Sequence, residues 1–236
     1  MFDIEARPRA ISVAAAIILA LLGAVPSHAA DKPAWSYALG AAVSTAYGYR
    51  VDQQPTGTTT TSFDPGLLLS GTVTRTLTRH TALTFSTGYR RYSRDLDLVA
   101  IPEVPPTTGQ LRSQYFSIGA GLRIEPKHGS GPYIQALPTI FISRWEENTV
   151  DREGTNLMTN EWRPRSSHSD SFQSVLAGIE LGAGFRVRFW SKLGTDFGLR
   201  ITSSGDPGEH DLGRFSSGKF HGLDELALVG GITWSP

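Results

Sequence analysis

Large apolar side chains alternate with small or polar ones along most of the chain, from Trp35 to Trp234. Successive side chains of a β-strand point to opposite faces, so this alternation indicates strands. Each stretch is about as long as a tilted strand that crosses a lipid bilayer, roughly 9–11 residues or slightly more. The pattern predicts eight strands, at residues 35–49, 66–78, 82–92, 114–125, 133–145, 172–188, 193–203 and 223–234.

The two faces of the predicted strands differ in kind. In the first strand the odd positions from Trp35 onward are mostly large or apolar, whereas the even positions are Ser, Ala and Gly. Such a face suits lipid, with aromatic residues at the two interfaces between membrane and water. The predicted aromatic girdle consists of Trp35, Tyr37, Tyr47, Tyr49, Tyr89, Trp145, Trp190 and Trp234.

Charged side chains share the face of the small residues, most clearly in the strands at 114–125, 172–188 and 193–203. If the barrel is closed, this face lines its lumen, and buried charges there need partners. We therefore expect a network of ion pairs inside the barrel. Its predicted members are Arg90, Arg123, Glu125, Glu180, Arg186, Arg188, Asp196, Arg200 and Glu225.

Two residues fit this pattern less well. Pro138 lies in the middle of the fifth predicted strand, although proline normally occurs at a sheet edge or a bulge. Arg75 has the parity of the lipid-facing side, but it lies near a turn, where its long side chain can extend to the interface.

The gaps between predicted strands alternate between short and long. The long ones, which are the candidate binding loops, are residues 51–65, 93–113, 146–171 and 204–222. Short turns at one rim and long loops at the other are typical of outer-membrane barrels, whose termini are periplasmic. A soluble lipocalin-like or sandwich protein is the alternative, but the glycine- and charge-rich face has little apolar bulk for a core.

The N-terminus has the features of a secretory signal peptide. Arg7 and Arg9 precede an uncharged run, residues 11–25, which is shorter than the roughly 20 residues of a membrane anchor, and small residues follow. We predict a signal peptide at residues 1–30 and one barrel domain at 31–236. The chain has no cysteine and a net charge of zero, so disulfides are excluded and nucleic acid is not an expected partner.

Two possible enzyme motifs fail on inspection. The run that begins at Gly119 and its near copy at Gly182 lack the third glycine of a dinucleotide-binding loop, and no helical pattern follows either copy. Ser166 and His168 have the spacing to share a strand face, as in lipid A deacylases, but the motif of that family is missing. We expect no catalytic residue, no metal site and no cofactor.

With signal peptide, alternating strands and short turns, the chain resembles the small outer-membrane β-barrels of bacteria, the OmpA-like and OmpX-like group. The resemblance implies an all-β, antiparallel, up-and-down barrel in the outer membrane, with a structural or surface-interaction role and a monomeric state. Its expected partners are membrane lipid, lipopolysaccharide and an extracellular ligand of the loops. Members usually end in an aromatic residue, whereas here Ser235 and Pro236 follow Trp234. A narrow channel, a lipid A hydrolase and a soluble periplasmic protein remain alternatives.

Overall fold

The computed structural model describes residues 35–47, 50–53, 57–60, 64–97, 107–125, 130–151, 153–155, 162–212, 216–220 and 222–236. The predicted signal peptide, the girdle residue Tyr49 and the side chain of Tyr47 lie outside what is described. Within these ranges, no helix is both long and apolar enough to cross a membrane.

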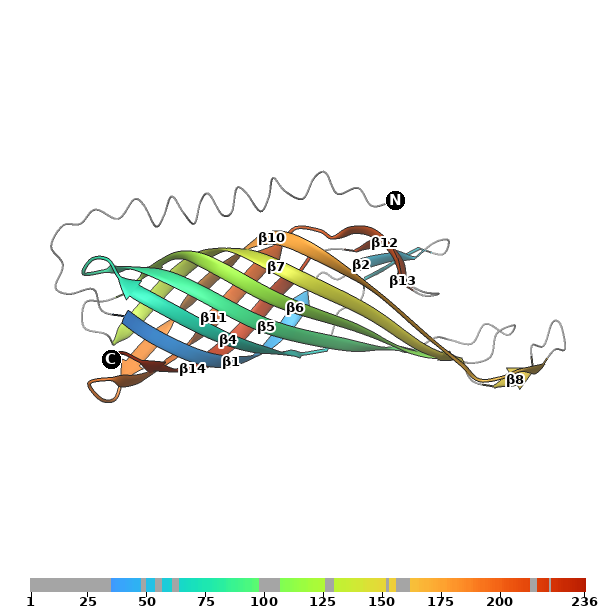
Figure 1. Ribbon diagram of the computed structural model, residues 1–236, viewed down its shortest axis with the longest axis horizontal. Helices are drawn as coiled ribbons and strands as arrows, with labels where there is room; N and C mark the ends of the chain where they lie inside the picture. The colour runs from blue at the N-terminus through green and yellow to red at the C-terminus, as the bar shows by residue number, and fades with distance from the viewer. Residues whose placement is uncertain are drawn as a thin grey trace.

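Eight antiparallel strands form a closed barrel (Figure 1). Each wall strand pairs with the next one along the chain, and the last pairs with the first. The predicted fold class is therefore confirmed. The strands are β1 (Trp35–Tyr47), β4 (Gly66–Thr76), β5 (Thr81–Asp97), β6 (Thr107–Ile124), β7 (Gly131–Asp151), β10 (Ser166–Arg188), β11 (Leu193–Ser204) and β14 (Asp224–Trp234).

The two ends of the barrel differ as the gap lengths predicted. Short turns join β4 to β5, β6 to β7 and β10 to β11 at the end where the C-terminus lies (Figure 1). We call this the short-turn end. The opposite, long-loop end has three small two-stranded sheets: β2 (Arg50–Gln53) with β3 (Gly57–Thr60), β8 (Gly154–Thr155) with β9 (Trp162–Arg163), and β12 (Gly208–Leu212) with β13 (Ser216–Phe220).

Four neighbouring strands are longer than predicted, all at the long-loop end. β5 continues to Asp97 and β7 to Asp151, while β6 begins at Thr107 and β10 at Ser166. Much of the predicted loops 93–113 and 146–171 is thus paired strand, and the loop prediction was wrong there. We call residues 93–97, 107–113, 146–151 and 166–171 the distal extension. In Figure 1 it tapers away from the barrel toward β8.

Pro138 lies inside β7 and causes neither an edge nor a bulge. Its pairing with Ile179 of β10 belongs to an uninterrupted ladder. On the other side, the ladder with β6 lacks two successive pairs at this point and then resumes in the same register. A residue without an N–H donor is accommodated by this local loss of pairing.

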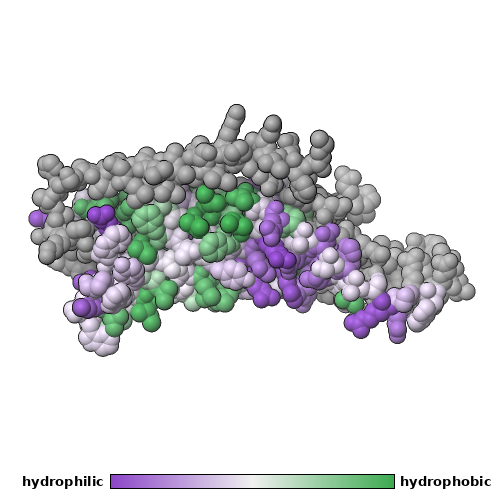
Figure 2. Space-filling view, viewed as in Figure 1, coloured by the Kyte–Doolittle hydropathy of each residue, from purple (hydrophilic) through white to green (hydrophobic). Residues whose placement is uncertain are grey.

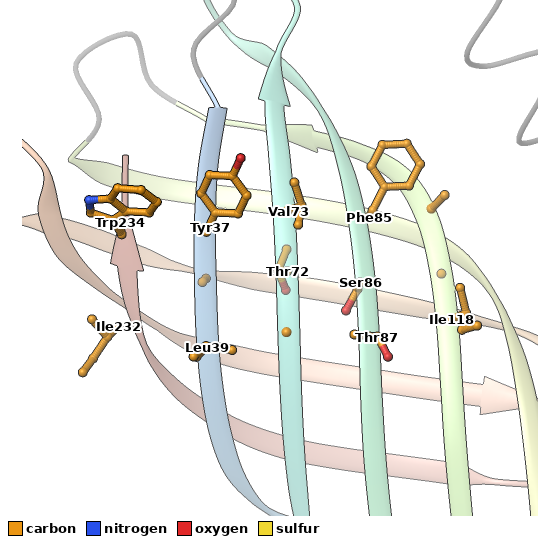
Figure 3. Close-up of a pocket in the computed structure, with 14 residues that line it drawn as sticks. Tyr37, Leu39, Thr72, Val73, Phe85, Ser86, Thr87, Ile118, Ile232 and Trp234 are labelled. Atoms are coloured by element: carbon orange, nitrogen blue, oxygen red, sulfur yellow. The ribbon is translucent and has the colours of Figure 1, made fainter. Parts of the chain in front are cut away.

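The outer wall of the barrel is apolar and its inside is polar. Leu39 and Ile232 are 76% and 69% exposed on the outside (Figure 3), whereas Arg90 and Glu180 are at most 2% exposed inside. In Figure 2, apolar patches lie on the middle of the barrel wall, and a hydrophilic area lies between them and the distal extension. An apolar belt of this extent suits lipid rather than water, which argues against the soluble alternative.

Candidate functional site

The apolar belt ends abruptly on the four long strands. Its last row consists of outward side chains that are paired directly across β5, β6, β7 and β10, namely Tyr89, Phe116, Ile142 and Val175. Two residues further along each strand the outward side chains are Arg91, Gln114, Arg144 and Gln173, which are likewise paired with one another. We call these the last apolar row and the first polar row. Together they place one edge of the membrane on the wall.

Inside the barrel, Arg90 is the centre of a buried ion-pair network. Its Nε donates to Glu225 Oε2 at 2.6 Å, its Nη2 to Glu180 Oε1 at 2.7 Å and its Nη1 to Ser117 Oγ at 2.7 Å. Arg200 Nη1 lies 3.4 Å from the other Glu180 oxygen. These residues come from β5, β6, β10, β11 and β14, so the network joins strands across the lumen.

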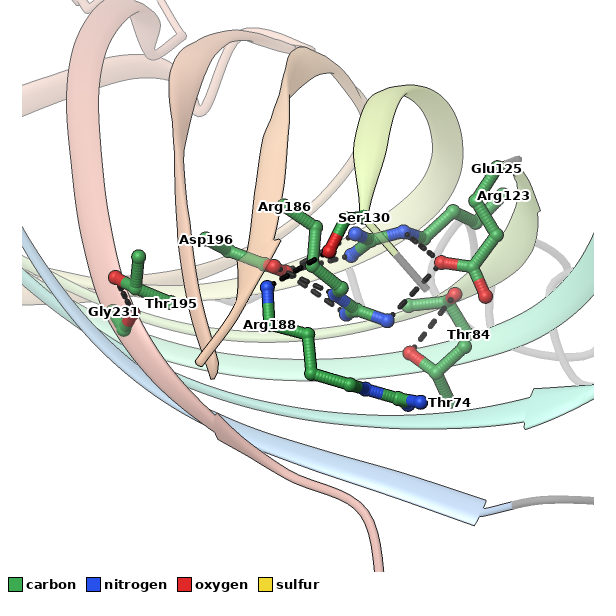
Figure 4. A network of polar contacts seen from close by, with 10 residues as sticks. All are labelled: Thr74, Thr84, Arg123, Glu125, Ser130, Arg186, Arg188, Thr195, Asp196 and Gly231. Atoms are coloured by element: carbon green, nitrogen blue, oxygen red, sulfur yellow. Dashed lines mark hydrogen bonds and ion pairs between the residues drawn. The ribbon is translucent and has the colours of Figure 1, made fainter. Parts of the chain in front are cut away.

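A second network fills the lumen nearer the short-turn end (Figure 4). Asp196 accepts from Arg186 Nε at 2.7 Å and from Arg123 at 3.1 Å. Glu125 lies 3.0 Å from Arg123 and 3.2 Å from Arg186. The Arg123 guanidinium also lies 3.6 Å from the centre of the Tyr133 ring. Two arginines and two carboxylates thus balance their charges at this level.

Glycine makes room for this second network. A Cβ at Gly184 would clash with the backbone oxygen of Phe197 and would lie 2.7 Å from the Tyr133 hydroxyl, so a larger residue would disturb both β11 and the ring on which Arg123 stacks. Gly184 precedes Arg186 by two residues on the same inner face. The small inward residues noted in the sequence therefore leave space for neighbouring large ones.

Eight of the nine predicted lumen residues belong to these two networks. Arg188 does not, because its side chain is exposed beyond the second network. Its backbone N–H donates to Ser130 Oγ at 3.0 Å, and within the described ranges its guanidinium has no ion pair.

Above the Arg90 network, toward the long-loop end, the lumen is filled by apolar and aromatic side chains. We call this group the distal cluster: Ala46, Tyr92, Leu111, Tyr115, Phe141, Trp145, Leu176, Phe220 and Leu223, with Phe172 packed against it. Phe220 reaches it from β13, outside the barrel wall, and packs edge-on against Trp145 and Phe172 at 5.4 and 4.9 Å. No sequence reasoning predicted the distal cluster.

Trp145 was assigned to the lipid-facing girdle, and this was wrong. It is 1% exposed and stacks on Phe172 at 6.1 Å inside the distal cluster. Trp145 lies four residues from Phe141, which is also buried, so the two side chains point to the same face of β7. The alternation along the strand therefore indicates an inward position for Trp145. The error arose because the strand was predicted to end at 145, whereas β7 continues six residues further.

The other described girdle residues lie on the outside. Trp35, Tyr37, Tyr89, Trp190 and Trp234 are between 39% and 69% exposed. Tyr37 and Trp234 are stacked at 5.5 Å near the short-turn end. Their outward position is what an interfacial aromatic belt requires.

The hydrolase candidates Ser166 and His168 are both exposed on the distal extension, away from the lumen networks. They lie two residues apart on the same strand, β10. Across the described ranges there is also no group of three His, Cys, Asp or Glu residues that could hold a metal ion. The prediction of a protein without enzymatic activity stays a prediction.

Comparison with known proteins identifies no family model and no curated protein that matches. Among solved structures, the chain is similar to the attachment invasion locus protein Ail of Yersinia pestis bound to sucrose octasulfate, with 12% identity and a TM-score of 0.42 over 87% of this chain and all of that one. Neisserial surface protein A matches with 15% identity and a TM-score of 0.36, over 85% and 96% of the two chains. The N-terminal β-barrel domain of Pseudomonas aeruginosa OprF matches with 15% identity and a TM-score of 0.32, over 85% and 97%.

Proposed function

We propose that this protein is an outer-membrane barrel that binds a partner outside the cell through its distal extension. The observation that carries the proposal is the continuation of β5, β6, β7 and β10 as one paired sheet beyond the last apolar row. A structure needed only to close the barrel would end at the membrane edge. The paired strands instead present an ordered polar surface to water.

The orientation follows from the two ends. Outer-membrane barrels have short periplasmic turns and longer extracellular loops, so the short-turn end lies in the periplasm and the distal extension outside the cell. At the membrane edge the first polar row then contains Arg91 and Arg144, both exposed. Arginine pairs well with phosphate, so these side chains suit lipopolysaccharide. Arg144 also pairs with Glu146 at 2.7 Å, which balances part of this charge.

The free edge of β10 is the best candidate for the binding surface. Its pairing with β11 stops at Gly178, after which Ala177 accepts one more bond from Gly205. Over residues 167–171 no described strand forms a ladder with this side of β10, whereas its other side is paired with β7. Since backbone groups alternate in direction, Ser167 and Ser169 direct their N–H and C=O groups to the free side, whereas the N–H of Ser171 already donates to Asp170 Oδ1 at 2.7 Å. Such an edge can pair with an extended peptide.

A proline substitution tests this edge. Ser169→Pro removes an N–H donor from the free side but leaves the ladder with β7 intact, and Ser169→Ala is the matched control. We expect the purified protein in nanodiscs to bind a subset of twelve-residue peptides on an array, and Ser169→Pro to lose at least about tenfold of that binding. Equal binding by the two variants, or no peptide bound by either, would contradict the proposal.

The same geometry argues against the narrow-channel alternative. An eight-stranded barrel is just wide enough to be filled by side chains. Here two ion-pair networks and the distal cluster occupy successive levels of the lumen. We expect no conductance in planar bilayers at any voltage, and discrete single-channel steps from the wild-type protein would restore that alternative.

A further inference from the structure

We propose that the outer wall at the short-turn end holds one phospholipid of the periplasmic leaflet, with its phosphate on Arg75 and one acyl chain in an adjoining groove. The site rests on the membrane orientation proposed above. It involves β1, β4, β5, β6 and β14 and is separate from the distal extension. Three observations support the site: the shape of the groove, the charge of Arg75, and the positions of the groove and of Arg75 relative to the membrane surface.

The groove lies on the outer wall and is almost wholly apolar (Figure 3). Leu39, Gly71, Thr87 and Ile118 are paired in one row across the wall. The groove is deepest at the small residues Gly71 and Thr87, between the larger side chains of Leu39 and Ile118. A Cβ at Gly71 would still find ordinary contacts, 3.5 Å from Thr87 and 3.8 Å from Leu39. The groove is therefore a real depression in the wall that a larger side chain can fill.

Aromatic side chains border the groove on the side of the short-turn end. Trp234, Tyr37, Val73 and Phe85 form the next row, paired one to the next across four strands, and Figure 3 shows them at one level. Aromatic residues of this kind concentrate where hydrocarbon meets headgroups. The groove thus runs from the headgroup level into the hydrocarbon.

Arg75 follows in the row after that, paired between Trp35 and Leu83. Its guanidinium carbon lies 5.4 Å from the centre of the Trp35 ring, which fixes the side chain against the outer wall. Across the described ranges, its buried Nε has no hydrogen-bond acceptor and no carboxylate forms an ion pair with the guanidinium. A guanidinium at this depth matches the phosphate of a phospholipid in charge and in donor geometry.

The distances suit a single lipid. Gly71 lies four residues from Arg75 on the same face of β4, about 13 Å along the strand. Half of a hydrocarbon core is about 15 Å deep. An acyl chain that starts from a phosphate on Arg75 therefore reaches over Gly71 and Thr87 within one leaflet.

Native mass spectrometry of the detergent-purified protein, titrated with palmitoyl-oleoyl phosphatidylglycerol, tests the site. We expect the first lipid to bind the wild type more tightly than any later one. Arg75→Gln should weaken this first step about tenfold, as expected for a lost charge-assisted hydrogen bond. Gly71→Leu fills the groove and should weaken it similarly. Arg79→Gln, which removes an exposed arginine of the adjacent turn, is the control and should bind as the wild type does.

The outcomes separate the possible explanations. If Arg75→Gln, Gly71→Leu and Arg79→Gln all bind lipid like the wild type, only unspecific annular lipid is present and the proposal is overturned. If inorganic phosphate at equal concentration displaces the lipid, Arg75 binds a free anion and the groove plays no part, which also overturns it. Heat-modifiable migration in gels verifies that each variant is folded. Peptide binding by the distal extension should be unchanged, so a failure here leaves the proposed function standing.

Discussion

In β5, β6, β7 and β10, apolar side chains point outward on one side of the last apolar row and inward on the other. Below it, β6 directs Ile118 and Leu122 outward and Arg123 inward. Above it, the same strand directs Arg112 outward and Leu111 inward, where Leu111 is 1% exposed. The outer solvent changes from lipid to water at this row, so the apolar face changes sides. One strand thus contains a membrane-protein segment and a soluble-protein segment in unbroken register.

The two segments also fill the lumen differently. At membrane depth the lumen contains charged, paired side chains, as in the Arg90 network, beside apolar ones such as Leu68 and Leu137. Toward the long-loop end the aromatic residues of the distal cluster pack as a core, with Glu147 also buried at this end. A buried charge is costly without its partner, whereas an aromatic core loses stability gradually as its volume is reduced. Substitutions in the Arg90 network should therefore reduce stability more than substitutions in the distal cluster.

The largest effect is expected at Arg90. Arg90→Leu leaves Glu180 and Glu225 buried together without their shared guanidinium, which should lower the free energy of unfolding by about 3–5 kcal/mol. Urea unfolding in liposomes measures it. The control Arg144→Ala breaks an exposed pair with Glu146 and should cost less than about 1 kcal/mol. Similar losses in the two variants would show that the lumen network is not a special contributor.

The sequence predicted the barrel because alternation survives wherever one side of a strand faces lipid. It failed for the distal ends of β5, β6, β7 and β10, because above the membrane the outer face is polar. Segments such as residues 93–97 and 107–113 then resemble solvated loops in composition. Trp145 was misplaced for the same reason, since a tryptophan at a supposed strand end suggests an interface.

The lumen was partly predictable. The alternation of side chains along each strand identifies which charged residues face inward, and it correctly placed Arg90 and Glu225 inside the barrel. Parity does not identify partners, because pairing across the lumen depends on how far each strand is shifted against its neighbours. Arg90 and Glu180 are ninety residues apart, and only the closed barrel brings them to 2.7 Å.

A scan with arginine along the outer face of β10 should locate the membrane edge directly. Leu181→Arg places a charge near the middle of the apolar belt and should cost about 2–4 kcal/mol. Gln173→Arg lies eight residues away in the first polar row and should cost at most about 1 kcal/mol. Urea unfolding in liposomes gives both values. Equal costs at the two positions would mean that the belt does not end at Val175.

The smallest effect concerns Trp145, whose placement separates the distal cluster from the girdle. Trp145→Phe keeps an aromatic ring but leaves a small cavity, which should cost about 1–2 kcal/mol. The more decisive readout is fluorescence, since Trp145 is enclosed while Trp190 and Trp234 face outward. In liposomes of brominated lipid, the fluorescence of Trp145 should not be quenched, so Trp145→Phe should remove an unquenched part of the emission. Trp190→Phe is the control, and it should remove a part of the emission that brominated lipid quenches. Strong quenching of the Trp145 component by brominated lipid would return this residue to the lipid-facing wall, and the change of sides at the last apolar row would then not hold for β7.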